Sequence, residues 1–109
     1  MVTPDQLNLR HIRAFCEVAA CGSILAASCR VHLSQPAITQ AIAKLERLLE
    51  TQLFRRAKAG MIPTQAGHVL AHRAARALEI LHAGALAAQG GQNDQKGFNS
   101  FDRLVTNPQ

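Results

Sequence analysis

The stretch Ser34-Gln35-Pro36-Ala37-Ile38-Thr39-Gln40-Ala41-Ile42-Ala43-Lys44-Leu45 decides the fold of this chain. It opens with a serine, which is a good helix N-cap, and it places a proline in the first turn, where backbone N–H groups have no intrahelical acceptor. Ile38, Ile42, Leu45 and Leu49 then follow at helical spacing and predict one core-facing stripe. The pattern predicts an amphipathic helix that presents short polar side chains at its N-terminal end.

The opposite face of this helix, with Thr39 on its flank, carries residue types suited to nucleic acid, and Gln35 lies nearer the core side but at the exposed N-terminal end. Gln35 and Gln40 each have an amide that can read adenine bidentately. The Ser34 hydroxyl and the free N–H groups of the first turn can hold a phosphate, and Lys44, with Arg47, suits backbone phosphate further along. Small side chains between them allow a close approach. The candidate contacts on this helix are Ser34, Gln35, Pro36, Thr39, Gln40 and Lys44.

Two more helices are expected upstream. The first spans about Leu9 to Ala20 and ends at Gly22, and Ser23 caps a short second helix over about Ile24–Val31. Two helices joined by a short turn, the second with a polar N-terminus, form a helix-turn-helix, whose second helix enters the major groove end first. The residues expected to face inward are Leu9, Ile12, Phe15, Cys16 and Ala19 in the first helix, and Ile24, Ala27 and Val31 in the second.

Downstream, the segment from Gln52 to Ile62 has no helical rhythm. Leu53-Phe54, a turn at Ala59-Gly60 and Met61-Ile62 predict two short strands, a β-wing on which Arg55 or Arg56 can reach phosphate or the adjacent minor groove. Leu53 and Phe54 are expected in the core. The predicted fold is mainly α: a winged helix-turn-helix of three helices and a small wing, followed by a long helix.

That long helix begins after Thr64, which caps it, and runs to about Ala88, before Gly90-Gly91. Its apolar row has a rough a/d spacing that Gly84 interrupts, so it either pairs with a second copy of the chain or packs only on its own domain. The row consists of Leu70, Ala74, Ala77, Leu81 and Ala88. The expected organisation is a DNA-binding domain over 1–63, a dimerisation helix over 64–89, and 90–109 as a flexible linker or the start of a missing downstream domain.

Length, charge and hydropathy limit the class of protein to which this chain can belong. The chain has 109 residues, enough for one domain, and a net charge of +5. Ten basic residues and three acids lie between Asn8 and Arg76, and no acid occurs from Thr51 to Leu78, so the positive charge belongs to the folded part. This favours a polyanion-binding surface over an ordinary solvated one. No apolar run is long enough to span a membrane, and no secretory signal is recognisable.

Chemistry beyond binding is not expected. Three cysteines without a CxxC pair argue against a disulfide framework and favour a cytoplasmic location. Cys16, Cys21, Cys29 and His32 lack the two tight pairs of a zinc site, so neither metal nor cofactor is predicted. The five histidines have no nucleophile or acid arranged around them, although His68 and His72 lie at a metal-capable spacing. Catalysis is therefore not predicted.

The residues also resemble a known family, the LysR-type transcriptional regulators. The resemblance covers roughly residues 8 to 88 and is carried by several pieces in family order. These are Ala19-Ala20-Cys21-Gly22-Ser23, His32-Leu33-Ser34-Gln35-Pro36-Ala37-Ile38-Thr39, Leu45-Glu46, Gln52-Leu53-Phe54-Arg55-Arg56 and Pro63-Thr64-Gln65-Ala66-Gly67. It implies a recognition helix from Ser34 to Lys44, with Gln35, Pro36, Thr39 and Gln40 toward the major groove, Arg56 or Arg55 on the wing, and pairing of two subunits through the 64–88 helix.

Some positions depart from the family pattern. Gln40 stands where many relatives have Arg, and Glu50 where they often have a helix-ending Gly, so the third helix is expected to end less sharply. Members normally continue into a co-inducer-binding domain, so a small-molecule inducer would act only through a domain absent from this chain. Val105-Thr106-Asn107-Pro108-Gln109 echoes the lead-in Val2-Thr3-Pro4-Asp5-Gln6, which raises the alternative of a second DNA-binding module beyond Gln109.

The predicted function is sequence-specific binding of double-stranded DNA by a homodimeric bacterial transcriptional regulator. Two alternatives stay open. A nonspecific nucleoid-type protein would bind every duplex equally well, and a helical protein-interaction module would self-associate without binding duplex DNA.

Overall fold

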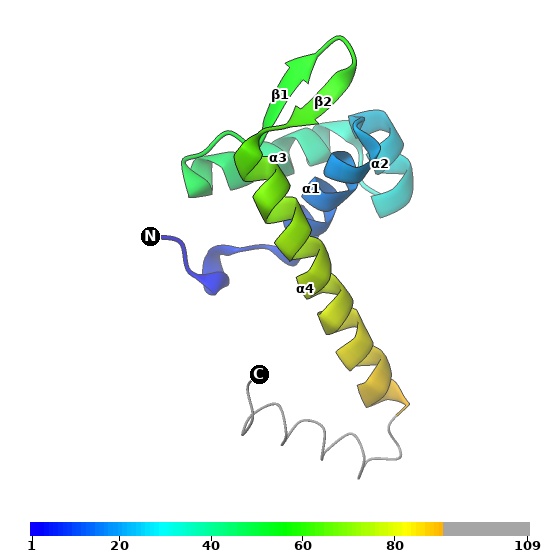
Figure 1. Ribbon diagram of the computed structural model, residues 1–109. Helices are drawn as coiled ribbons and strands as arrows, with labels where there is room; N and C mark the ends of the chain where they lie inside the picture. The colour runs from blue at the N-terminus through cyan, green and yellow to red at the C-terminus, as the bar shows by residue number, and fades with distance from the viewer. Residues whose placement is uncertain (91–109) are drawn as a thin grey trace. The chain divides into compact units, whose positions relative to one another are not determined.

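The structure, a computed structural model, describes residues 1–90 (Figure 1). The predicted linker from 91 onward and the Val105–Gln109 echo lie outside the described residues. The elements, in chain order, are a 3-10 turn Pro4–Gln6, α1 Leu9–Cys21, α2 Ile24–Val31, α3 Gln35–Leu49, β1 Phe54–Ala57, β2 Gly60–Pro63 and α4 Gln65–Gln89. The strands form an antiparallel hairpin in which Phe54 pairs with Pro63 and Ala57 with Gly60. The predicted mainly helical fold with a two-stranded wing is confirmed.

The chain divides into two compact units, one over Met1–Arg76 and one that begins at Ala77. The first unit holds α1, α2, α3, the hairpin and about three turns of α4. In Figure 1 the helices α1 to α3 gather beneath the hairpin. The second unit, within the described residues, is the rest of α4, where every residue after Leu78 is exposed. The division therefore falls inside α4, after Arg76.

The buried face of α1 differs from the predicted one. Ile12 and Phe15 are buried as expected, but Leu9 is 56% exposed, while Ala14 and Val18 are completely buried. The buried sector is thus rotated by roughly a quarter turn from the predicted stripe, at 100° per residue. The reason is that α1 packs against three partners, α2, α3 and β2, which together cover a wider sector than one apolar stripe.

The core joins the three helices to the wing. Ile38, Ile42 and Leu45 of α3 are buried as predicted. Leu53 and Phe54 are also buried, and the rings of Phe54 and Phe15 lie 5.4 Å apart between centroids at a tilt of 58°, a favourable aromatic arrangement. The first residues of the wing are therefore part of the helical core.

The helix ends follow the predicted caps in most cases. The Ser23 and Ser34 hydroxyls accept hydrogen bonds from the backbone N–H groups of Ala26 and Ala37, both at 3.1 Å. The end of α3 corrects a prediction. Glu50 adopts a left-handed conformation, with φ of 51°, and its N–H and that of Thr51 bond back to the last turn, so α3 ends sharply even without the glycine.

Two glycines allow close approaches that place the wing. Gly60 has φ of 121°, and a Cβ there would collide with the carbonyl oxygen of Gly22 in the turn between α1 and α2. The next residue, Met61, donates its N–H to that same oxygen at 3.1 Å. A Cβ on Gly67 would collide with the Leu53 carbonyl oxygen. The wing is therefore held at both ends by backbone contacts that leave no room for a side chain.

Candidate nucleic-acid interface

The N-terminal part of α3 presents the predicted contact residues to solvent. Gln35, Pro36, Thr39, Gln40 and Lys44 are all exposed, whereas Ile38, Ala41 and Ile42 on the opposite face are buried. The burial of one face fixes the rotation of α3, so the polar face has no alternative but to point outward. Ala41 is also buried, although it was not part of the predicted apolar stripe. We call the exposed set, together with Ser34, the α3 polar face.

Ser34 has a structural role besides any contact with a ligand. Its Oγ accepts the hydrogen bond from the Ala37 N–H and so satisfies one of the free donors at the start of α3. The hydroxyl hydrogen remains free to donate to a phosphate oxygen, since a hydroxyl both accepts and donates. The cap and the predicted phosphate contact are therefore compatible.

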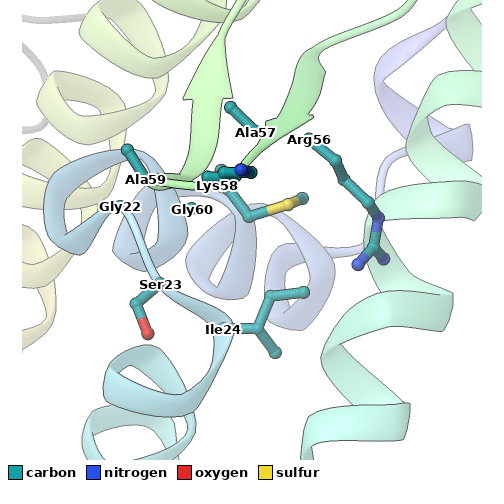
Figure 2. Close-up of a pocket in the computed structure, with 9 residues that line it drawn as sticks. Gly22, Ser23, Ile24, Arg56, Ala57, Lys58, Ala59 and Gly60 are labelled. Atoms are coloured by element: carbon teal, nitrogen blue, oxygen red, sulfur yellow. The ribbon is translucent and has the colours of Figure 1, made fainter.

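The wing brings one arginine next to α3. Arg56 and Thr39 line the same hollow, of about 340 Å³, together with Ala43 and Glu46 of α3. Figure 2 shows the Arg56 side chain extending from β1 toward α3. Successive residues of a strand point to opposite faces, so Arg55 lies on the other face of the hairpin, opposite Ile62 in the register. Of the two arginines that sequence left as alternatives, Arg56 is the one beside the α3 polar face.

A second hollow lies between the wing tip and the start of α2 (Figure 2). Arg56 and Lys58 line it with Ser23, Ile24 and backbone of the α1–α2 turn. Lys58 is exposed, and it was not among the predicted contacts although it sits in the acid-free segment. Lys58 is therefore a second cation of the wing, after Arg56, on this side of the molecule.

The basic residues of this surface are not neutralised by acids. Within residues 1–90, the ion pairs are those of Glu17 with Arg13 at 3.2 Å and with Arg30 at 3.9 Å. Lys44, Arg56 and the other cations near α3 and the wing have no acidic partner in that part of the chain. The positive field at the surface is thus available to a polyanion.

Two titratable groups report on the surroundings. Partial burial, followed by the charges of Lys44 and Arg10, lowers the pKa of His11. The start of α1 therefore lies close enough to Lys44 to share its positive field. Burial and the Glu17 carboxylate raise the pKa of the Cys16 thiol, which keeps it protonated at neutral pH.

Glu46 was quoted in the sequence only as part of the Leu45-Glu46 piece of the resemblance and was not among the predicted site residues. Its Oε2 accepts hydrogen bonds from the N–H groups of Leu53 at 2.8 Å and Phe54 at 3.3 Å. The available signal was its isolation, because it is the one acid between Gln35 and Leu49, on a face that is otherwise basic or neutral. At seven residues after Thr39, it lies on the same side of α3, about two turns away.

The predicted dimerisation row is exposed in its C-terminal part and partly or largely buried in its N-terminal part. Ala77, Leu81 and Ala88 are exposed, Leu70 is half-buried, and Ala74 is 8% exposed within the first compact unit. Large apolar side chains outside the row are exposed on the same helix, namely Val69, Ile80 and Leu86. The free apolar surface of α4 is therefore larger than the predicted row, and pairing through it stays a prediction.

Among residues 1–90 no three His, Cys, Asp or Glu side chains are grouped so that they could hold a metal ion, and the cysteines of this part are free. In the same part of the chain no helix is both long and apolar enough to cross a membrane.

A three-helix core, an exposed polar start to α3 and a basic hairpin beside it define the winged helix-turn-helix class of DNA-binding domain. Residues 9–68 match the family described as bacterial regulatory helix-turn-helix protein, lysR family. The chain belongs to this family.

Individual relatives agree with this assignment. The HTH-type transcriptional regulator AbaB of Streptomyces antibioticus is 44% identical over 75 residues, which are 69% of this chain and 25% of that protein. The nitrogen assimilation regulatory protein nac of Klebsiella aerogenes is 39% identical over 64 residues, 59% of this chain and 21% of that protein. The chain therefore spans a quarter or less of the length of these two relatives.

Solved structures give the same result. The DNA complex of the CbnR DNA-binding domain aligns with a TM-score of 0.71 and 32% identity, over 79% of this chain and 99% of that one. Full-length CbnR, a LysR family transcriptional regulator, aligns with a TM-score of 0.71 and 34% identity, over 76% of this chain and 29% of that one. The described fold is that of a LysR-type DNA-binding domain.

Proposed function

We propose that this chain binds double-stranded DNA with sequence specificity, as the DNA-reading part of a bacterial transcriptional regulator. The observation that carries the proposal is the exposed α3 polar face with Arg56 beside it, whose cations form no ion pair with an acid among residues 1–90. The similarity to the CbnR domain, whose structure contains DNA, supports the same function.

Each contact has a role set by its chemistry. Gln35 and Gln40 read base edges in the major groove, since an amide can donate to and accept from adenine at once. Thr39 lies between them on the same face and offers a methyl and a hydroxyl. Lys44 and Ser34 bind backbone phosphates, which position the helix without carrying sequence information. Arg56 reaches phosphate or the adjacent minor groove from the wing.

The proposed assembly is a homodimer through α4. The exposed Leu81, Ala77 and Ala88 would form the contact, with the neighbouring Ile80 and Leu86 adding apolar area. Two recognition helices separated by one helical turn of DNA, about 34 Å, would read a near-palindromic site.

Selection from a random duplex library, followed by binding measurements on the recovered site, tests the proposal. Gln35→Ala should reduce the preference for the selected site over random duplex, while Lys44→Ala should weaken both alike and lower the dependence of log affinity on log salt by about one. Gln65→Ala is a matched control, because Gln65 is an exposed amide at the start of α4. Equal affinity for all duplexes would instead indicate a nucleoid-type protein.

The dimer is tested separately by sedimentation. Leu81→Asp should shift the chain toward monomer, and His82→Asp, which adds charge at the neighbouring exposed position, should have a much smaller effect. Self-association without measurable binding to any duplex at low salt would favour the protein-interaction module.

A further inference from the structure

We propose that Glu46 is a positioning residue for DNA recognition, which holds the wing, and with it Arg56, at a fixed place relative to the α3 polar face. The proposal rests on the proposed function and adds to it a residue that does not itself touch DNA. Glu46 places a carboxylate on a surface that would meet a polyanion, which a negative charge repels.

The Glu46 carboxylate is engaged with the backbone of the wing. One oxygen, Oε2, accepts from the N–H groups of Leu53 and Phe54, the two residues with which the chain enters β1. Both of these residues are almost completely buried, at 1% and 4% exposure, so their N–H groups need a protein partner. An ionised acceptor makes such bonds stronger than a neutral one.

The bonds act directly on the position of Arg56. Phe54 and Arg56 are two residues apart in β1 and share one face of the strand. Arg56, Thr39, Ala43 and Glu46 line the same hollow, so the anchor on α3 and the arginine on β1 border one space. Fixing the start of β1 on α3 therefore fixes the distance between the wing arginine and the helix that reads bases.

Two backbone hydrogen bonds also hold the hairpin, but neither joins it to α3. Met61 donates to the Gly22 carbonyl, and Thr64 donates to the Leu53 carbonyl at 2.9 Å. The first ties β2 to the α1–α2 turn and the second ties Leu53 to the residue before α4, whereas within residues 1–90 Glu46 supplies the side-chain hydrogen bonds from α3 to the start of β1. Its loss should leave the wing folded and let β1 shift relative to α3.

A double-mutant cycle between Glu46 and Arg56 tests this on the selected duplex. Arg56→Ala should lower affinity about tenfold in the wild-type background, the size of one charged contact. In the Glu46→Ala background the same change should cost less than about threefold, because Arg56 is already displaced. Glu46→Gln retains a neutral acceptor and should preserve most of the Arg56 effect. An undiminished tenfold effect in Glu46→Ala would overturn the proposal.

Controls separate positioning from charge and from stability. Glu50→Gln removes a negative charge from the exposed end of α3 without touching the wing, so it should not alter the Arg56 effect. A purely stabilising role for Glu46 would reduce the active fraction but leave the Arg56 ratio and the salt dependence unchanged.

Amide hydrogen exchange gives a readout that does not need DNA. Exchange at Leu53 and Phe54 should accelerate at least tenfold in Glu46→Ala, and by less in Glu46→Gln, while α1 amides change little. Unchanged exchange at the start of β1 would reject the positioning role. If amide exchange accelerates in Glu46→Ala as expected, but the wild-type protein binds no duplex selectively, the proposed function is rejected instead.

Discussion

The same substitution, glycine to alanine, should have opposite effects at two places in helix α4. Alanine is the better helix former by about 1 kcal/mol, so propensity alone favours both changes. Gly84 has no atom within 4 Å of where its Cβ would be, and Gly84→Ala should therefore stabilise the helix by about that amount. Gly67 differs, because its Cβ would collide with the Leu53 carbonyl oxygen and lie 3.3 Å from the Cβ of Pro63.

The cost at Gly67 follows from what the colliding atom does. The Leu53 oxygen is backbone, it accepts the Thr64 N–H at 2.9 Å, and it cannot rotate away as the end of a side chain can. Overpacking of this kind costs about 1–3 kcal/mol, and weakening the hydrogen bond adds about 1 kcal/mol. After the gain in propensity, Gly67→Ala should destabilise the domain by about 1–3 kcal/mol.

Urea denaturation and thermal melting at one protein concentration measure the difference. For a domain of this size each 1 kcal/mol corresponds to about 4–8 °C in Tm, so Gly67→Ala should melt clearly below the wild-type protein. Gly84→Ala should raise the helical signal of circular dichroism without lowering the Tm. If Gly67→Ala is as stable as the wild-type protein or more so, the close approach of α4 to Leu53 does not exist.

Three further changes have expected outcomes of known sign. Glu50→Gly should raise the free energy of unfolding by about 0.5–1 kcal/mol, because glycine adopts the left-handed conformation without strain. Glu50→Gln should raise it by less, and an equal rise would assign the effect to the charge of Glu50. Ser34→Ala should cost about 1 kcal/mol in urea denaturation through loss of the α3 cap, and no loss would mean that Ser34 does not cap. The pKa of His11 is lowered in the folded protein, so the unfolded chain binds the proton more readily and stability falls as pH drops through about 6.5. Urea titrations should show a smaller fall in His11→Gln, and an identical fall would contradict the lowered pKa.

The elements of this fold were predictable because their signals are local. Ser23 and Ser34 each accept the N–H of the residue three positions on, and that is a property of a single turn of chain. The exposed face of α3 followed from the spacing of Ile38, Ile42 and Leu45, since burial of one stripe fixes the opposite face. These parts needed no knowledge of the rest of the molecule.

The buried face of α1 was harder because three elements cover it. A single stripe through Leu9 and Ile12 assumes one packing partner, whereas α1 contacts α2, α3 and β2. Ala14 is small enough to be completely buried between these elements, and a small residue contributes little to an apolar periodicity. Glu50 shows a different case, in which a residue other than glycine ends the helix with a left-handed φ of 51°, and the N–H groups of Glu50 and Thr51 bond back to Arg47 and Glu46.

The choice between Arg55 and Arg56 could not be made from sequence, because it depends on which face of the hairpin meets α3. That face is fixed by contacts between different elements: Met61 with Gly22, and Leu53 with both Glu46 and Thr64. A two-stranded hairpin has little stability of its own, so its position is decided by these external contacts. It follows that the contribution of the wing to DNA binding depends on residues that do not contact DNA, and that substitutions at Gly22 or Glu46 should change recognition as well as folding.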